Sequence, residues 1–418
     1  MKKRCSILLI GTRIKGNLGG PSLLFSTEKV LRSYIPDASI MFFPIPPEDD
    51  IKKIEIYGFK PIKYTHKKLY LSFLLSLMTF MLKKLGISIS KITKKHSLLR
   101  VFLDADIVID INGISFTDYF PGKKNYFLQS IRLLIGILLG KPVGKFTQDM
   151  GPFNNFWNRL FAKITLKHLK FILVRSEKTK KYVMNLGINK DIHVYPDTAF
   201  ILPAVSSNEI NRILTQEGIN NQSFVVLVPS RQVDVRISRK ENKDISELNN
   251  YVLTVARVAD YMIEKYGILI VFIPNERSSQ KDGYDDLYVS KKIVSAMENK
   301  QSTKILINSY SAPQIKGIIS KAELVVSSRY HSTIAALSLS VPCFVIGWGF
   351  KYLEVMKLFN LEKYVCNFES LELDKIIELI EYIWQNRTQI QKHIRNFLPT
   401  IEEKIMSTGK YIITAINN

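Results

Sequence analysis

An arginine and a histidine lie two positions apart in the stretch Ser327–Ser332 (SSRYHS). The stretch follows a predicted strand, Leu324–Ser327, and precedes a predicted helix, Ser332–Leu339. A helix start offers free N–H groups and the positive end of the helix dipole. The guanidinium of Arg329 adds a fork that suits a carboxylate or a phosphate, and His331 can exchange a proton near neutral pH. The pattern therefore predicts an anion site with proton transfer, and the alternative is a surface arginine beside a core histidine.

A second arginine closes another predicted strand in the same half of the chain. The apolar run SFVVLVPSR ends in Arg231. Because the carboxyl ends of parallel strands meet at one edge of a sheet, we expect Arg231 to lie near Arg329 and His331. The alternative for a lone arginine at this position is a solvated loop residue. Arg236 and Arg239 follow in a predicted polar loop and are weaker candidates.

Small and polar residues close three predicted strands in the N-terminal half. The first of these segments, Lys15–Pro21 (KGNLGGP), has glycines that permit positive φ and close approach of the backbone to a ligand. It matches neither the dinucleotide fingerprint nor the P-loop pattern. The other two segments are Asp110–Ser115 (DINGIS) and Thr147–Pro152 (TQDMGP). Their polar side chains suit a hydroxyl-rich ligand, and the alternative is three ordinary turns.

Apolar strands alternate with helical patterns along the chain, from Ser6–Gly11 to Pro342–Ile346. Such continuous apolar strands are typical of parallel sheets that helices cover on both faces. The pattern pauses over Leu202–Asn221, where we place a linker near Pro203–Ser207. The sequence therefore predicts an α/β protein with two Rossmann-like doubly wound domains and an interdomain cleft. The expected bounds are residues 1–203 and 204–385 for the two domains and 386–418 for C-terminal helices.

The composition and charge of the chain indicate which classes of binding partner to expect. The chain has 418 residues and a formal net charge of +22, which favours anionic partners. Its basic runs are short and spread over the whole chain, so nucleic acid is not an expected partner. The three cysteines lack metal-ligand spacing, and no HExxH pattern occurs. We therefore expect reduced thiols and no protein-held metal.

One apolar run, Leu69–Leu82 (LYLSFLLSLMTFML), has a pair of lysines on each side. It is too short to span a bilayer, so the alternatives are a buried helix and an interfacial helix on anionic lipid. The start of the chain, MKKRCSILLIG, is similar to a signal peptide, but its apolar run is short and Arg13 and Lys15 follow it. We predict a first buried strand there. The expected location is the cytoplasm, with peripheral contact on the inner face of the membrane as an alternative.

Taken together, the motifs resemble those of the polysaccharide pyruvyl transferase family in their order from about Ile7 to about Tyr364. The Ser-x-Arg-x-His element is the most specific of them. Three positions depart from the family pattern: Gly20 replaces an acid, Asn275 stands where many members have histidine, and Asp149 replaces a glycine. The motifs are, in chain order, Gly16–Gly19, Asn112–Gly113, Gln148–Pro152, Val174–Glu177 with Leu186–Gly187, Asp197–Phe200, Arg231, Ser327–His331, Val341–Pro342 and Lys351–Tyr352.

The resemblance implies a glycosyltransferase-B-like fold and a defined reaction. A pyruvyl group would pass from phosphoenolpyruvate to a sugar of a cell-surface polysaccharide or its precursor, forming a pyruvate ketal and releasing phosphate. Phosphoenolpyruvate would be a donor substrate, and no cofactor is implied. The resemblance carries Arg231, Arg329 and His331 over as the catalytic donor site, with Ser328 and Lys351 as further donor-binding residues. The arginines would hold the carboxylate and phosphate, and His331 would orient the phosphate or shuttle a proton.

The resemblance also implies that the N-terminal domain holds the sugar acceptor, free or lipid-linked. The candidate acceptor-binding residues are Asn17, Asn112, Gln148 and Asp149. Two other functions stay open on the same architecture. One is a nucleotide-sugar glycosyltransferase, since an arginine at a strand end serves a diphosphate equally well. The other is a non-catalytic family member in polysaccharide assembly. The sequence predicts neither the acceptor sugar nor the oligomeric state.

Overall fold

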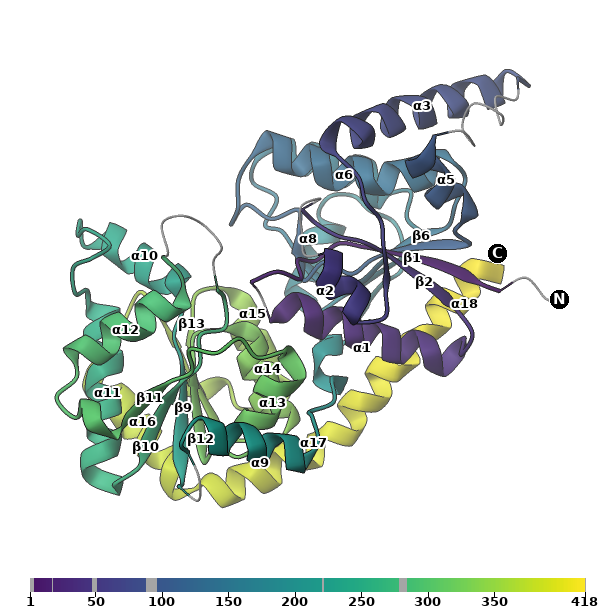
Figure 1. The fold of residues 1–418 in the computed structure, drawn as a ribbon. Coiled ribbons are helices and arrows are strands. Elements are labelled where there is room, and N and C mark those ends of the chain that lie inside the picture. Colours follow the sequence, from purple (N-terminus) through teal and green to yellow (C-terminus); the bar gives the residue numbers. More distant parts are fainter. Residues whose placement is uncertain are drawn as a thin grey trace. The chain divides into compact units, whose positions relative to one another are not determined.

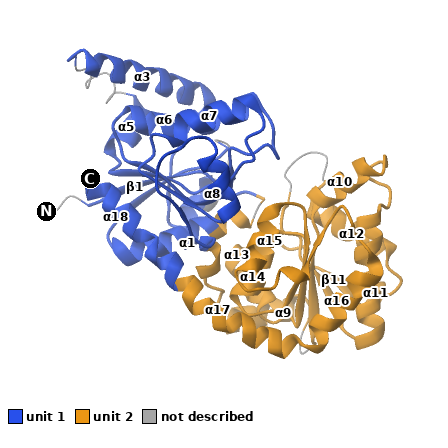
Figure 2. Cartoon of the chain, turned by 180° about the vertical axis from the view of Figure 1, so that it is seen from behind, with its two compact units in different colours: residues 1–15, 23–198, 403–418 blue, residues 16–22, 199–402 orange. Residues whose placement is uncertain are grey.

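The computed structural model describes residues 4–16, 18–46, 51–87, 96–219, 222–277 and 284–417. The chain divides into two compact units (Figure 1 and Figure 2). Unit 1 holds residues 1–15, 23–198 and 403–418, and unit 2 holds residues 16–22 and 199–402.

Unit 1 is built on a parallel sheet whose strand order, over the described residues, is β3-β2-β1-β4-β6-β7-β8, with β5 paired to β6. Each of these pairings is parallel. The strands are β1 (Ser6–Ile10), β2 (Ser39–Phe43), β3 (Lys60–Pro61), β4 (Ile107–Asp110), β5 (Ile114–Ser115), β6 (Val143–Met150), β7 (Phe171–Val174) and β8 (Ile192–Val194). The helices are α1 (Gly19–Tyr34), α2 (Ile51–Ile56), α3 (His66–Lys84), α5 (Ser97–Asp104), α6 (Lys123–Leu138), α7 (Phe156–Leu166), α8 (Glu177–Met184) and α18 (Gly409–Asn417).

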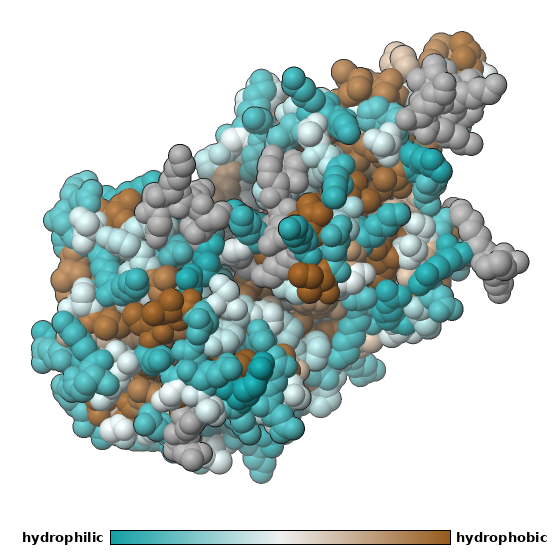
Figure 3. Space-filling model, viewed as in Figure 1, coloured by the Kyte–Doolittle hydropathy of each residue, from teal (hydrophilic) through white to brown (hydrophobic). Residues whose placement is uncertain are grey.

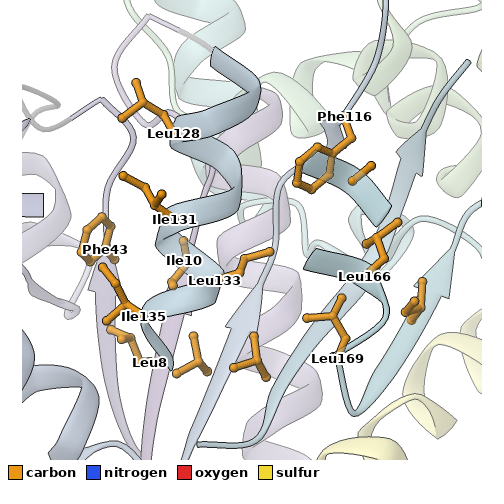
Figure 4. Packing of buried hydrophobic residues seen from close by; sticks show 14 of the residues in the cluster. Leu8, Ile10, Phe43, Phe116, Leu128, Ile131, Leu133, Ile135, Leu166 and Leu169 are labelled. Carbon is orange, nitrogen blue, oxygen red and sulfur yellow. The ribbon is translucent and has the colours of Figure 1, made fainter. Parts of the chain in front are cut away.

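The hydrophobic core of unit 1 lies between this sheet and its helices. Leu8 and Ile10 of β1 and Phe43 of β2 belong to one buried cluster with Ile131 and Ile135 of α6 (Figure 4). The central strands are buried on both faces, which explains why each reads in the sequence as a continuous apolar run.

Unit 2 has a parallel sheet in the order β11-β10-β9-β12-β13-β14 across its described strands. Counted from the first strand of the unit, this is the doubly wound order 3-2-1-4-5-6, in which the direction of winding reverses between β9 and β12. The strands are β9 (Phe224–Val228), β10 (Leu269–Phe272), β11 (Thr303–Ile305), β12 (Leu324–Ser327), β13 (Cys343–Gly347) and β14 (Val365–Asn367). The helices are η1 (Thr198–Ile201), α9 (Ser207–Gln216), α10 (Arg231–Lys240), α11 (Asn250–Tyr266), α12 (Asp286–Ala296), η2 (Lys300–Ser302), α13 (Ala312–Ile319), α14 (Tyr330–Ser338), α15 (Phe350–Lys357), η3 (Glu362–Tyr364), α16 (Leu373–Gln385) and α17 (Arg387–Ser407).

The predicted fold class, two Rossmann-like α/β halves, is confirmed. The observed division of the chain differs from the predicted one, because unit 2 begins at Ala199 rather than at residue 204. The buried Lys316 explains the shift: its Nζ donates to the carbonyl oxygens of Phe200 at 3.0 Å and Leu202 at 2.6 Å. These two hydrogen bonds attach Phe200 and Leu202 to the helix α13 of unit 2.

The predicted pause over Leu202–Asn221 was wrong for half of its length, because the helix α9 occupies residues 207–216. Ser206 caps this helix by accepting a hydrogen bond from the backbone N–H of Glu209. Ile210 and Ile213 are the residues of α9 that are buried. With so narrow an apolar stripe, the segment resembles a polar linker in the sequence. Similarly, Arg236 and Arg239 lie in the helix α10 and not in a polar loop.

The predicted C-terminal helices over 386–418 are observed as α17 and α18, and residues 403–418 belong to unit 1. Tyr411 of α18 explains this. Its ring lies 4.7 Å from that of His193 and 6.4 Å from that of Phe171, and its hydroxyl is 3.2 Å from that of Tyr195. The last helix therefore packs on the strands β7 and β8.

Candidate active site

The two strands at the winding reversal of unit 2 each lead to one of the predicted arginines. Val228, the last residue of β9, pairs with Ser327, the last residue of β12. Arg231 is the first residue of α10, and Arg329 precedes α14 as its N-cap. Ligands of doubly wound sheets bind at this edge, beside helix N-termini. The structure therefore brings the two arginines to the position where the sequence placed them.

A buried aspartate joins the two arginine positions. The Oδ1 of Asp286 accepts a hydrogen bond from the backbone N–H of Arg231 at 2.9 Å, and it also accepts one from Nη2 of Arg329. Its Oδ2 accepts a further hydrogen bond from the backbone N–H of Glu276 at 2.8 Å. Asp286 is fully buried at the start of α12. One carboxylate thus fixes the turn after β9, the turn after β12 and the segment after β10.

Arg329 has a second acidic partner that is closer to solvent. Its Nη1 lies 2.9 Å from Oε2 of Glu276, whose side chain is 29% exposed. Burial lowers the pKa of Arg329, but the negative charges of Asp286 and Glu276 outweigh it and raise that pKa above its ordinary value. Arg329 therefore stays positively charged. The buried Asp286 holds its Nη2, and the partly exposed Glu276 holds its Nη1.

Two buried tyrosines fix the backbone around the arginines. The hydroxyl of Tyr251 accepts from the N–H of Ser230 at 3.0 Å and donates to Oγ of Ser328 at 2.9 Å. The hydroxyl of Tyr352 donates to the carbonyl of Ser328 at 2.9 Å. Burial raises the pKa of Tyr251 and of Tyr352, so both hydroxyls keep their protons. Ser328, a predicted donor-binding residue, is 2% exposed and has a structural role in this network.

His331 lies half-buried in the first turn of α14, with its ring edge-on to that of Tyr330 at 5.4 Å. It lines a small cavity of about 20 Å³ in unit 2 together with Asn275 and Ser332. The hydroxyl of Ser332 lies 3.4 Å from Oδ1 of Asn275. Asn275, one of the departures from the family pattern, therefore shares a cavity with the candidate proton donor.

Lys351 lies at the start of α15 among three aromatic rings. Its Nζ is 4.7 Å from the ring centre of Trp348, 4.9 Å from that of Tyr330 and 5.5 Å from that of Tyr352. Such cation–π contacts hold an ammonium group in place while leaving it charged. Because Tyr330 stands between Arg329 and His331 in the chain, the structure brings Lys351 to the same strand-end region.

The glycine segment after β1 is bound to unit 2 by its backbone. The carbonyl of Gly16 accepts a hydrogen bond from the N–H of Arg277 at 2.9 Å. Leu18 and Ser22 from the same segment line the cavity beside His331. Asn17, a predicted acceptor-binding residue, lies outside the described residues. The structure therefore gives the segment a packing role in unit 2.

Gly16→Ala is expected to lower the free energy of unfolding by about 2 kcal/mol more than Gly218→Ala does. Both glycines have a positive φ, +67° and +70°. A Cβ on Gly16 would lie 2.2 Å from the carbonyl oxygen of Arg277, whereas one on Gly218 meets nothing within 4 Å. Urea denaturation of the two variants measures the difference, and equal losses would contradict the close approach.

The other predicted acceptor-binding residues lie at strand ends of unit 1. Asn112 follows β4 and is half-buried, and its Oδ1 accepts from the N–H of Thr12 at 3.0 Å. Gln148 is fully buried, and its Nε2 donates to the carbonyl of Asp110 at 2.9 Å. Asp149 is 1% exposed and accepts from the hydroxyl of Thr179 at 3.1 Å. Asn112 is thus the most accessible of the three.

Two buried cations that were not selected from the sequence contact two of these three residues, Gln148 and Asp149. The Nζ of Lys145 donates to Oδ2 of Asp110 at 2.5 Å and to Oε1 of Gln148 at 2.8 Å. Burial lowers the pKa of Lys145, and the charge of Asp110 opposes that shift. The Nη2 of Arg175 lies 2.8 Å from Oδ2 of Asp197, and its Nη1 lies 3.8 Å from Oδ2 of Asp149. Several polar side chains at this edge of unit 1 therefore form hydrogen bonds and ion pairs with one another.

Asp286, Glu276 and Tyr251 contact the residues of the candidate site and were not predicted from the sequence. The signal available for Asp286 was the acidic pair in YDDLY at the start of a predicted helix, which is also typical of an ordinary N-cap. Asp285 does cap α12, accepting from the N–H groups of Leu287 and Tyr288. Among the residues that the structure describes, no group of three or more His, Cys, Asp and Glu side chains could hold a metal ion.

The comparisons with known proteins agree with this architecture. The solved structures that are similar include a glycosyltransferase from Rickettsia africae (13% identity, TM-score 0.59, covering 100% of this chain and 99% of that one). They also include a UDP-GlcNAc 2-epimerase from Neisseria meningitidis, bound to UDP-GlcNAc (13% identity, TM-score 0.58, covering 98% and 99%). At such low identity they show the fold alone, which is glycosyltransferase-B-like, as predicted.

Sequence comparison identifies the family. The amylovoran biosynthesis protein AmsJ of Erwinia amylovora is 21% identical over 292 residues, which cover 69% of this chain and 68% of AmsJ. The family model described as polysaccharide pyruvyl transferase matches residues 17–349, which include Arg231, Arg329 and His331. The match covers well over half of the chain, so this chain belongs to the polysaccharide pyruvyl transferase family.

Proposed function

We propose that this protein transfers a pyruvyl group from phosphoenolpyruvate to a sugar residue of a polysaccharide or its precursor, forming a pyruvate ketal and releasing phosphate. The observation that carries the proposal is the placement of Arg231 and Arg329 after the two strands at the winding reversal of unit 2, with Asp286 joining them. Membership of the family supports the reaction class.

The charges of the site suit a small anion with two acidic groups. Phosphoenolpyruvate has a carboxylate and a phosphate, and each is a good partner for a guanidinium fork. Arg231 is partly exposed at the N-terminus of α10, where helix N–H groups also favour an anion. Lys351 adds a third cation at this edge of the sheet. In our assignment Arg329 holds one acidic group and Arg231 the other.

The proposed steps balance without a cofactor. His331 donates or relays a proton to the methylene carbon of phosphoenolpyruvate, which becomes the methyl group. A sugar hydroxyl attacks the adjacent carbon and loses its proton to the imidazole of His331, which restores the proton donor. The bond from that carbon to the phosphate oxygen breaks, and a second hydroxyl attacks and releases its proton to the departing phosphate. The arginines stabilise the negative charge that phosphate carries away.

We assign the acceptor, free or lipid-linked, to the strand ends of unit 1. Asn112 is the proposed direct contact because it is the most accessible of the polar candidates there. Gln148 and Asp149 are buried, so we infer that they act by positioning the turns beside Asn112. Asn17 stays a predicted contact in the glycine segment.

Glu276→Gln is expected to bind phosphoenolpyruvate about fivefold more tightly than the wild type. The carboxylate of Glu276 occupies Nη1 of Arg329 and repels an incoming anion, and the amide removes that charge at nearly constant shape. Calorimetric titration measures the change, with Glu298→Gln, at a surface ion pair with Arg257, as the matched control. Weaker binding by Glu276→Gln would contradict the competition.

The reaction is tested by incubating the protein with phosphoenolpyruvate and a panel of methyl glycosides of galactose, glucose and mannose. Expected are phosphate release that depends on an acceptor and a new ketal methyl signal by NMR. His331→Gln is expected to bind phosphoenolpyruvate but to release little phosphate. Phosphate release without a ketal, or full activity of His331→Gln, would overturn the assignment.

A further inference from the structure

The helix α3 presents apolar side chains on two opposite faces. Its inner face is buried through Leu69, Ser72 and Ser76. Tyr70 and Phe73 on this side lie with their rings 6.1 Å from that of Phe127 on α6. The buried-helix alternative from the sequence therefore holds for one face of α3.

The outer face of α3 is exposed and equally apolar. Its side chains follow one another at intervals of three or four residues, so they form one stripe along the helix. We call this stripe the α3 outer face (Figure 3, upper right). It consists of Leu71 (48% exposed), Leu74 (60%), Met78 (40%), Met81 (59%) and, just past the helix end, Leu85 (73%). Contiguous exposed apolar surface of this kind marks an interaction site, whereas scattered single residues do not.

The charged lysines of α3 itself give it a single sign of charge. Lys67 and Lys68 lie at the start of α3 and Lys83 and Lys84 at its end, all four exposed. No aspartate or glutamate occurs in the sequence from residue 66 to residue 87. The outer face is therefore an apolar stripe with a lysine pair at each end.

The helices α6 and α7 lie beside α3 on this side of unit 1 (Figure 2), and a row of aromatic rings runs from α6 to α7. Phe127 lies 5.6 Å from Phe161, which lies 6.1 Å from Trp157. Trp157 and its neighbour Phe156 are 36% and 64% exposed. The Nζ of Lys123 lies 3.8 Å from the ring centre of Trp157. Tryptophan and lysine side by side are typical of groups that lie at the level of lipid headgroups.

We propose that the α3 outer face docks unit 1 onto the surface of an anionic lipid bilayer. The helix would lie in the plane of the membrane, with its Leu and Met side chains among the acyl chains and its lysines on lipid phosphates. In the described part of the chain no helix is long and apolar enough to cross a membrane. A second copy of this chain is a poorer occupant, because it would place lysine pairs against lysine pairs. This inference goes beyond the proposed reaction and does not depend on it.

Vesicle flotation tests the inference with the full chain. Wild-type protein is expected to float with phosphatidylcholine vesicles that contain phosphatidylglycerol and to float much less with phosphatidylcholine alone, and high salt is expected to weaken the binding. The variant Leu74→Ser/Met78→Ser/Met81→Ser is expected to lose about tenfold or more in partitioning. The matched control is Met184→Ser/Leu253→Ser/Ile307→Ser, which removes three exposed apolar side chains elsewhere and is expected to float like the wild type.

The lysines are tested separately from the apolar stripe. Replacement of Lys67, Lys68, Lys83 and Lys84 by Gln is expected to abolish the preference for anionic vesicles. Replacement of the exposed Lys291, Lys300, Lys321 and Lys392 by Gln removes the same charge from unit 2 and is expected to preserve it. Circular dichroism confirms that each variant is folded before flotation.

Three results would overturn the inference. One is absence of wild-type binding to anionic vesicles, and another is an equal loss in the α3 variants and their matched controls. The third is a wild-type oligomer, seen by light scattering, that the serine variant dissociates while vesicle binding stays unchanged, which would assign the stripe to a second copy.

Discussion

Arg329→Lys is expected to weaken the binding of phosphoenolpyruvate about tenfold to a hundredfold. Lysine keeps the positive charge beside Asp286, so the buried carboxylate is not left without a cation. It loses the planar fork that can contact Asp286 and a ligand anion at the same time. Hydrogen bonds to charged groups contribute about 1.5 to 3 kcal/mol, which corresponds to the stated change in Kd.

The measurement is a calorimetric titration of phosphoenolpyruvate into the variant. Arg212→Lys, at an exposed position of α9, is the control for the chemical change alone, and its Kd should equal that of the wild type. An unchanged Kd for Arg329→Lys would mean that Arg329 acts only as the structural partner of Asp286.

Asp286→Ala is expected to lower the free energy of unfolding by about 3 kcal/mol or more. The substitution leaves the backbone N–H groups of Arg231 and Glu276 without their acceptor. It also leaves the buried guanidinium of Arg329 with Glu276 as its remaining acidic partner. Breaking a buried ion pair from one side is costly because the other charge stays buried.

Urea denaturation measures this loss, and Glu298→Ala in the same unit is the matched control. The ion pair between Glu298 and Arg257 is at the surface, with side chains 67% and 63% exposed, so its removal should cost less than about 1 kcal/mol. A loss for Asp286→Ala no larger than that of the control would show that the carboxylate does not hold the three segments together.

The sequence predicted the strand ends of the candidate site well, for a physical reason. The strands β9 and β12 are buried on both faces, so they read as apolar runs whose ends are visible in the sequence. In a parallel sheet those ends share one edge. The positions of Arg231 and Arg329 followed from the two runs alone.

The groups that fix those arginines could not be predicted in the same way. Asp286 and Tyr251 reach the site from α12 and α11, which lie between the two strands in the chain but are not part of either run. Which side chain of a helix reaches a given strand end depends on how that helix packs on the sheet. The apolar pattern of a single sequence does not show how a helix packs on the sheet.

Unit 1 shows the same limit for polar groups inside a strand. Lys145 lies within β6 and is fully buried, although lysine side chains are usually exposed to solvent. Its partner Asp110 closes a different strand, so the pair arises from strand neighbours 35 residues apart. The segment around α3 was ambiguous because a helix that is apolar on two faces has no polar side to reveal which face packs inward.

The most direct test of the proposed donor site is the titration of phosphoenolpyruvate into the wild-type protein, with UDP-GlcNAc titrated in parallel. Phosphoenolpyruvate is expected to bind at one site per chain, Arg329→Lys is expected to weaken this binding, and UDP-GlcNAc is expected not to compete with it. Binding of UDP-GlcNAc at a site that Arg329→Lys weakens, with no binding of phosphoenolpyruvate, would contradict the proposed donor site and favour a nucleotide-sugar glycosyltransferase. Binding of neither ligand would contradict the donor site and favour a non-catalytic role in polysaccharide assembly.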